Sequence, residues 1–161
     1  GGREVELLYT PGHTLNSMCL LDLASRGLFL GDALGTLAGS RVVMPQAFPT
    51  QFDLETTLQT IDRLEALRPS LVYPSHFGPA RDVALAFSSA REVVVTWKDV
   101  ALEALRAGEP AEAIVDRFQA LVDGYPAEET SPSPYARAPF RVMLGLCVTG
   151  YTLYFRRKGL L

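Results

Sequence analysis

Histidine is the residue best suited to chemistry near neutral pH, and this sequence has only two, His13 and His76. His13 stands shortly before the apolar run 17–23, and Asp32 directly follows the run 27–31. Two apolar runs joined by a short turn form an antiparallel hairpin, in which one strand starts at the sheet edge where its partner ends. We therefore expect His13 and Asp32 to be neighbours.

His76 follows a third apolar run, 71–73, at the kind of strand end where ligands gather in α/β sheets. Two imidazoles and a carboxylate at one sheet edge suit zinc or a similar metal ion. By spacing alone, however, a surface histidine, a core histidine and a turn aspartate are the commoner interpretation. Spacing therefore leaves both interpretations open.

Apolar periodicity and turn residues predict the elements that position these side chains. Short strands are expected at residues 4–10, 17–23, 27–31 and 71–73. Residues 35–50 contain two glycines and two prolines without a clear period, which predicts a long, shaped loop. Asp53 is expected to cap an amphipathic helix that runs to Leu67 and is stopped by Pro69.

The rest of the chain reads as helical. A long helix is expected over 80–107, and a second helix starts with Pro110 in its first turn. Four prolines predict a loop over 125–139, followed by a helix over 140–150 and a β-prone end over 151–155. The simplest division is an α/β body (1–79) with a helical extension (80–161).

Composition excludes several classes of protein. The 161 residues are 48% hydrophobic and 20% charged, enough for a packed core, and the net charge of −3 gives no field that attracts nucleic acid. The longest uncharged apolar run, 142–155, is too short to cross a bilayer, and no secretory segment stands at the start. Cys19 and Cys147 are expected to be buried free thiols. We expect a cytoplasmic protein.

Three motifs carry a family resemblance. Thr-Pro-Gly-His-Thr at 10–14, Leu-Phe-Leu-Gly-Asp-Ala-Leu at 28–34 and Tyr-Pro-Ser-His-Phe-Gly-Pro at 73–79 occur in this order. The sequence thereby resembles the second half of the metallo-β-lactamase superfamily. The resemblance implies an α/β fold of the α+β sandwich type: the C-terminal half of an αββα sandwich at 1–79, then a winged-helix-like helical extension similar to that of the glyoxalase II branch.

The resemblance also implies metal ligands. His13 corresponds to a ligand of the first metal, Asp32 to the bridging carboxylate and His76 to a ligand of the second metal. One or two zinc ions are implied, with iron or manganese as alternatives. Leu15-Asn16 and Ser75 depart from the usual motif in positions that shape the backbone.

The larger departure is the missing His-x-His-x-Asp-His cluster, which two histidines cannot supply. That cluster belongs to the first half of the fold and includes the proton-accepting aspartate. The 161 residues are therefore expected to be the C-terminal half of a longer enzyme and inactive alone. The missing half would come from the same polypeptide or another chain, and no catalytic residue beyond the metal ligands is assigned.

The implied function is a metal-dependent hydrolase in which a metal-bound water attacks a small-molecule substrate. The apolar residues Met44, Phe48, Phe52 and Trp97 favour an acyl thioester or ester, although each fits a core position equally well. The alternative is an inactive fragment or binding module that uses the acid-free stretch 131–161, with its five basic residues, to contact a partner or nucleic acid. No membrane or nucleic-acid partner is expected, and a homo-oligomer stays open.

Overall fold

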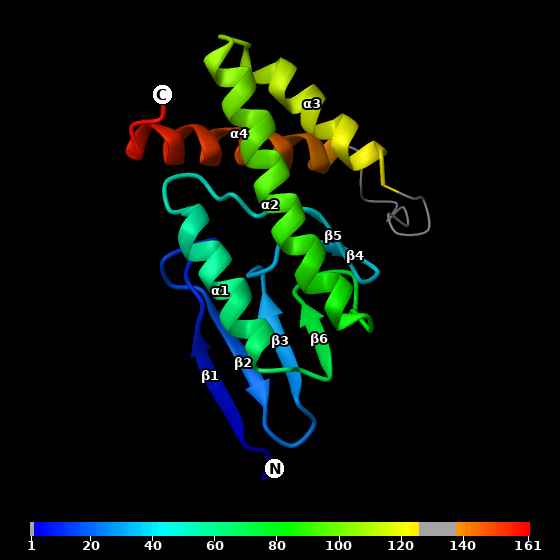
Figure 1. Cartoon of the computed structure of the whole chain (residues 1–161). Helices are drawn as coiled ribbons and strands as arrows, with labels where there is room; N and C mark the ends of the chain where they lie inside the picture. Colours follow the sequence, from blue (N-terminus) through cyan, green and yellow to red (C-terminus); the bar gives the residue numbers. More distant parts are fainter. Residues whose placement is uncertain (1, 126–137) are drawn as a thin grey trace.

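The main sheet of the protein has four strands in the order β1-β2-β3-β6, in a computed structural model that describes residues 2–125 and 138–161. The strands are β1 (Val5–Tyr9), β2 (Met18–Asp22), β3 (Gly27–Gly31) and β6 (Leu71–Pro74). β2 is antiparallel to β1 and to β3, whereas β6 is parallel to β3. The expected hairpin is confirmed, and the loops that follow β1, β3 and β6 leave the same edge of the sheet (Figure 1).

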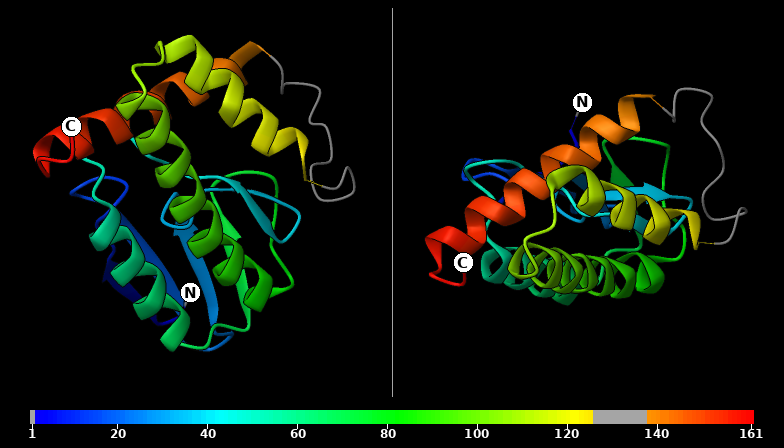
Figure 2. Two further views of the ribbon diagram at one scale, coloured as in Figure 1. Left: turned by 45° about the horizontal axis from the view of Figure 1, so that its top comes forward. Right: turned by 90° about the horizontal axis from the view of Figure 1, so that it is seen from above.

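Two helices cover one face of this sheet (Figures 1 and 2). They are α1 (Leu54–Ala66) and α2 (Val83–Arg106). Asp53 caps α1 as expected, because its carboxylate accepts a hydrogen bond from the Thr56 N–H at 3.0 Å. Arg91 on α2 forms ion pairs with Asp62 and Glu65 on α1 and so ties the two helices together.

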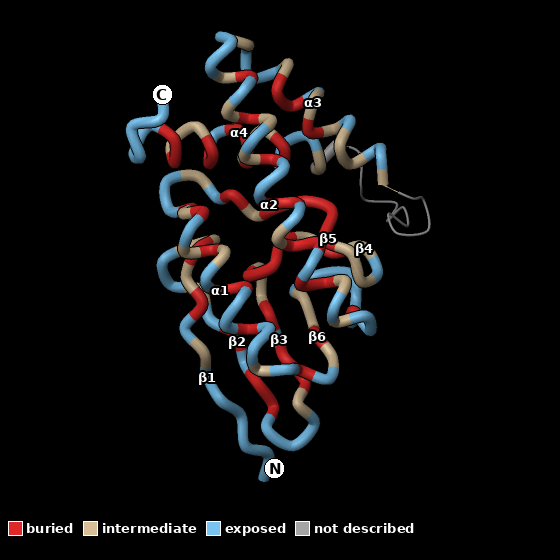
Figure 3. Tube along the Cα trace, viewed as in Figure 1, coloured by how far each residue is buried: buried red, intermediate tan, exposed pale blue. Residues whose placement is uncertain are grey.

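Burial alternates along the central strands, because successive side chains point to opposite faces of a sheet. Cys19 and Leu21 of β2 and Leu28 and Leu30 of β3 are buried under the helices. Their neighbours on the other face are exposed, among them Phe29 at 45%. Figure 3 shows β1 exposed along most of its length. The core therefore lies on the helical side of the sheet.

The prediction of an irregular loop over 35–50 is wrong for its first part. β4 (Thr36–Ala38) and β5 (Arg41–Met44) pair antiparallel across the two-residue turn Gly39-Ser40. Gly39 has a positive φ of 58°, which suits such a tight turn. Of the two glycines that suggested a loop, Gly39 marks the turn of a hairpin instead, and after this hairpin residues 45–50 lie outside regular strands.

The C-terminal segment also differs from the prediction. α3 (Ala111–Asp123) starts one residue after Pro110, which is its N-cap, and α4 (Ala138–Arg157) is one continuous helix. The β-prone end expected at 151–155 is therefore wrong. Leu144, Cys147, Tyr151 and Tyr154 are buried at helical spacing, and this apolar stripe outweighs the β preference of the aromatic residues.

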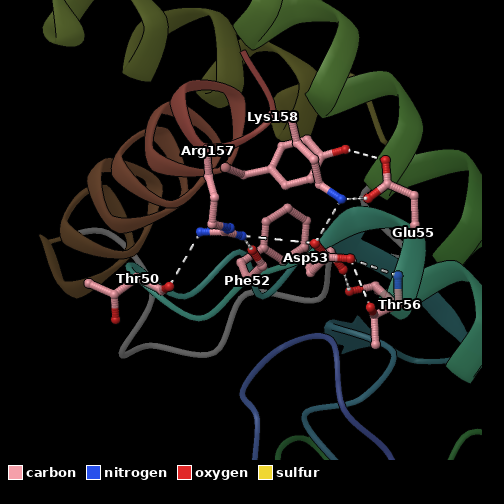
Figure 4. A network of polar contacts seen from close by, with 9 residues as sticks. Thr50, Phe52, Asp53, Glu55, Thr56, Arg157 and Lys158 are labelled. Carbon is pink, nitrogen blue, oxygen red and sulfur yellow. Dashed lines mark hydrogen bonds and ion pairs between the residues drawn. The ribbon is translucent and has the colours of Figure 1, made fainter. Parts of the chain in front are cut away.

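α4 lies across the edge of the sheet at which β1, β3 and β6 end (Figures 1 and 2). Its C-terminal end is fixed to the start of α1 by a polar network (Figure 4). Lys158 contacts Asp53 at 3.2 Å and Glu55 at 2.9 Å, and the Tyr154 hydroxyl donates to Glu55 at 2.6 Å. Charged residues about 100 positions apart in the sequence thus join the last helix to the first.

The boundary expected between residues 79 and 80 stays a prediction, since α2 packs against both α1 and β5 of the preceding part. The expected loop 125–139 falls mostly on residues 126–137, which lie outside the described part of the chain. None of the described helices is long and apolar enough to span a bilayer.

Candidate metal site

The three candidate residues belong to loops at one edge of the main sheet. His13 lies in the loop between β1 and β2, Asp32 directly follows β3, and His76 lies two residues after β6. The Ser75 N–H donates a hydrogen bond to the Gly31 carbonyl at 3.2 Å, so the loop after β6 runs beside the end of β3. The strand topology therefore sends all three motifs to the same region.

His13 and Asp32 are neighbours, as the hairpin predicts. The Nε2 atom of His13 lies 3.9 Å from Oδ2 of Asp32. The side chains are 14% and 35% exposed, which leaves the pair at the border between core and solvent. A site of this kind is open to a small molecule yet partly shielded from bulk water.

The tautomer of His13 follows from its second ring nitrogen. Nδ1 lies 2.8 Å from the backbone carbonyl oxygen of Gln46. A carbonyl oxygen only accepts hydrogen bonds, so Nδ1 carries the hydrogen and donates it. In the neutral ring Nε2 then bears a lone pair, which faces the Asp32 carboxylate. Two acceptors opposite one another attract only through a proton or a cation between them.

The geometry of this pair fits a metal ion. Zinc–nitrogen and zinc–oxygen bonds of about 2.0–2.2 Å allow two ligand atoms up to about 4.2 Å apart to share one ion, and a tetrahedral angle sets them about 3.4 Å apart. The observed 3.9 Å lies inside that reach. The Nδ1–H to carbonyl hydrogen bond is also the common way in which a metal-ligating histidine is oriented.

His76 is not part of a comparable pair. It is exposed, and its ring contact is with Phe77, at 5.9 Å between centroids. Within residues 2–125 and 138–161, no group of three or more His, Cys, Asp and Glu side chains is placed to hold a metal ion. The structure therefore brings together two of the three candidates, and the role of all three as ligands stays a prediction.

A small pocket lies beside His13 and Asp32, with apolar side chains that include Leu34, Phe52 and Ile61 in its wall. Its interior has room for about one water molecule. Of the other apolar candidates, Met44 and Trp97 are buried core residues. The pocket is too small for a substrate, so substrate would contact its rim.

One residue of the site, Gln46, escapes sequence reasoning. Gln46 contributes a backbone carbonyl, which every residue type has, so no pattern could identify it. Phe48 packs its ring edge-on against His13 at 5.4 Å between centroids and is 44% exposed. Phe48 was a candidate for the substrate pocket, and its place beside His13 is compatible with that role.

The two cysteines are free and buried, as expected. Burial raises the pKa of the Cys19 thiol, and it raises the pKa of Cys147 to about 12. Both are therefore neutral thiols at physiological pH, and neither is suited to act as a nucleophile.

A comparison with protein families finds a match over the segment that contains the three candidate residues. The family model described as the metallo-beta-lactamase superfamily matches residues 1–76, a segment that contains His13, Asp32 and His76. Residues 1–76, just under half of the chain, are similar to this superfamily. No curated protein matches the sequence.

Solved structures of this fold resemble nearly the whole chain. A metallo-beta-lactamase family protein from Thermus thermophilus is 23% identical over 98% of this chain, with a TM-score of 0.58. A beta-lactamase domain protein from Burkholderia ambifaria is 20% identical over 99%, with a TM-score of 0.60. The match covers 46% and 43% of those proteins, so this chain spans less than half of their length.

Proposed function

We propose that this chain supplies the metal-bearing C-terminal half of a metal-dependent hydrolase of the metallo-β-lactamase superfamily. The observation that carries the proposal is the His13 Nε2 lone pair, which faces the Asp32 carboxylate at 3.9 Å. His13 and Asp32 would hold a metal ion, with His76 as a further ligand from the same sheet edge. When bound, such an ion supplies Lewis acidity for activating water and polarising a carbonyl.

The chain's own residues supply orientation and shielding. The Gln46 carbonyl fixes the tautomer of His13, and Phe48 covers one edge of its ring. Catalytic zinc sites have three protein ligands. The resemblance assigns His13 and His76 to different ions that share Asp32, so each ion would have only two ligands from these residues. We therefore propose that the complete ligand set includes residues outside this chain's described part, in keeping with a length below half that of the structural neighbours.

The proposed substrate is a small acyl thioester or ester. The Phe48 ring, which is exposed beside His13, suits the apolar part of an acyl group better than a polyanion. The alternative of a binding module with a basic tail has less support. Arg157 and Lys158 pair with Asp53, and Arg141 pairs with Asp116, so these cations are engaged within the chain.

Metal analysis of Asp32→Asn tests the proposal. Protein purified without chelator should carry zinc, iron or manganese, and Asp32→Asn should lower its affinity for added zinc by more than about tenfold, since even changes outside the ligand shell cost 10- to 100-fold. In the complete enzyme, Asp32→Asn should also lower the rate of acyl-thioester hydrolysis, which is measured by the release of free thiol.

The matched control is Asp116→Asn, which changes an exposed carboxylate in an ion pair with Arg141. It should leave metal content and hydrolysis unchanged. Wild-type protein without stoichiometric metal, or an Asp32→Asn variant with unaltered zinc affinity, would overturn the proposal.

A further inference from the structure

We infer that helix α4 positions His13, through the segment Pro45-Gln46-Ala47 and a close helix contact that only a glycine at position 150 permits. The inference rests on the proposed metal role of His13, and it assigns positioning residues for that site in the C-terminal extension. The segment 45–47 touches His13 on one side and α4 on the other.

The inner contact determines which nitrogen of His13 faces Asp32. The Gln46 carbonyl accepts the Nδ1–H hydrogen at 2.8 Å, and the Gln46 side-chain amide donates to Thr36 Oγ1 at 2.8 Å. The side-chain bond ties Gln46 to β4, so its carbonyl keeps one direction. If this carbonyl turned away, Nδ1 would lose its acceptor, and the hydrogen would be free to move to Nε2.

The outer contact is made by two residues of α4. The Cys147 thiol donates to the Pro45 carbonyl at 3.2 Å, and both residues are buried. One turn later, the backbone of Gly150 packs directly on Ala47: a Cβ at position 150 would overlap the Ala47 carbonyl oxygen and lie 2.7 Å from its carbonyl carbon. The absence of a side chain at 150 therefore sets how closely α4 approaches the segment.

These contacts form one continuous, packed path. Ala47 and Cys147 are 1% and 2% exposed, so the interface between α4 and the segment excludes water. Close-packed interiors transmit a displacement instead of absorbing it. A methyl group at position 150 must move Ala47 or α4, and the peptide beside Ala47 carries the Gln46 carbonyl that holds His13.

The tautomer of His13 is the direct measurement. The chain has two histidines, so long-range proton–nitrogen correlation spectra of the imidazoles give two patterns, which a His76→Gln variant assigns. At about pH 8.5, where an ordinary imidazole is neutral, wild-type His13 should show the Nδ1–H form alone. Gly150→Ala should convert this pattern to a mixture of the two tautomers and weaken zinc binding about 10- to 100-fold.

Gly145→Ala is the matched control, because Gly145 lies on the same helix and a Cβ there meets nothing within 4 Å. Both substitutions raise helix propensity, but only Gly150→Ala should alter His13. Cys147→Ala, which removes the thiol donor to Pro45 without adding volume, should shift the tautomer in the same direction and decides the matter if Gly150→Ala does not fold.

The inference is overturned if Gly150→Ala folds and its His13 spectrum is that of the wild type. If Gly150→Ala does not fold, a wild-type His13 spectrum in Cys147→Ala overturns it. An equal change of the His13 spectrum in Gly145→Ala overturns it as well. The tautomer is read without any metal. Loss of zinc binding in every form, wild type included, would thus contradict the proposed function, while the tautomer pattern would still test the role of α4.

Discussion

Gly12 lets the loop that carries His13 lie directly on helix α1. Its φ is +138°, and a Cβ at this position would lie 2.7 Å from Cα and 2.9 Å from N of Thr57. Two hydrogen bonds hold the same stretch of loop: the Asp53 N–H donates to the Gly12 carbonyl at 3.0 Å, and the Thr60 hydroxyl donates to the Pro11 carbonyl at 2.6 Å. The backbone before His13 is thus fixed from three points on α1 and its cap.

Gly12→Ala should destabilise the protein by about 3 kcal/mol, because it combines an unfavourable φ with overlap against helix backbone that cannot move away alone. The free energy of unfolding in urea measures the loss. Gly39→Ala is the control: φ is +58° and nothing lies within 4 Å of its Cβ, so strain alone should cost about 1 kcal/mol. Equal losses in the two variants would show that the contact with Thr57 is unimportant.

The sequence predicted which candidate residues are neighbours where side-chain type and strand order carry the information. The contact between His13 and Asp32 followed from the hairpin alone, since the start of one strand and the end of its partner share an edge. The link from His13 to Gly150 was beyond reach. It depends on a backbone carbonyl at Gln46 and on close packing between segments about 100 residues apart in sequence.

Among the elements, α1 was predictable because its signals are local. Asp53 gives the cap, leucines recur at helical spacing and Pro69 stops the helix. The hairpin of β4 and β5 and the last turns of α4 were missed because local preference points elsewhere there. The aromatic residues Tyr151, Tyr154 and Phe155 favour strands, but burial of one helical stripe against the core decides the outcome.

The junction between α1 and α4 depends on ionised carboxylates. Burial raises the pKa of Asp53, but hydrogen bonds from Thr56 and contact with Lys158 outweigh this, and the pKa is lowered overall. The pKa of Glu55 is lowered in the same way, because the Tyr154 hydroxyl and Lys158 outweigh its burial. A carboxyl whose pKa is lower in the folded state stabilises the fold above its unfolded pKa, and this contribution disappears as pH falls through the folded pKa.

We therefore expect the stability to fall as pH drops below about 4, the ordinary pKa range of Asp and Glu in an unfolded chain, and on through their lower pKa values in the folded state. Asp53→Asn preserves a good helix cap and removes only the charge, so it should flatten part of this dependence, whereas Asp53→Ala should cost a further ~1 kcal/mol at neutral pH. Thermal unfolding across the pH range measures both.

Lys158→Gln should also weaken the dependence of stability on pH in the acid range, because it removes the ammonium group that Asp53 and Glu55 share. Lys98→Gln changes the other lysine of the chain, which pairs with Asp99. Lys98→Gln should leave the dependence of stability on acid pH as it is in the wild type. A wild-type pH profile in Asp53→Asn and Lys158→Gln alike would contradict an electrostatic role for the junction.

On the scale of the whole molecule, the residues that the structure describes cover the main sheet on one face only (Figures 1 and 2). The face opposite α1 and α2 carries large apolar side chains on three neighbouring strands. These residues are Val5, Leu7, Tyr9, Met18, Leu20 and Phe29, each 40–60% exposed. Phe29 also stacks on Tyr73 of β6 at 4.6 Å between centroids, so the apolar surface continues across the sheet. Contiguous apolar surface of this kind marks an interaction face.

The isolated 161-residue chain should therefore self-associate and bind an apolar dye, since the free energy of covering this face exceeds that of leaving it in water. Leu7 and Leu20 are cross-strand partners on the exposed face, and replacing both by lysine should shift the protein toward monomer in sedimentation and lower dye fluorescence. Val142→Lys, at a 64% exposed position on α4, is the control and should change neither measurement. A wild-type chain that sediments as a monomer and leaves the dye dark would mean that the exposed sheet face is stable in water without a partner.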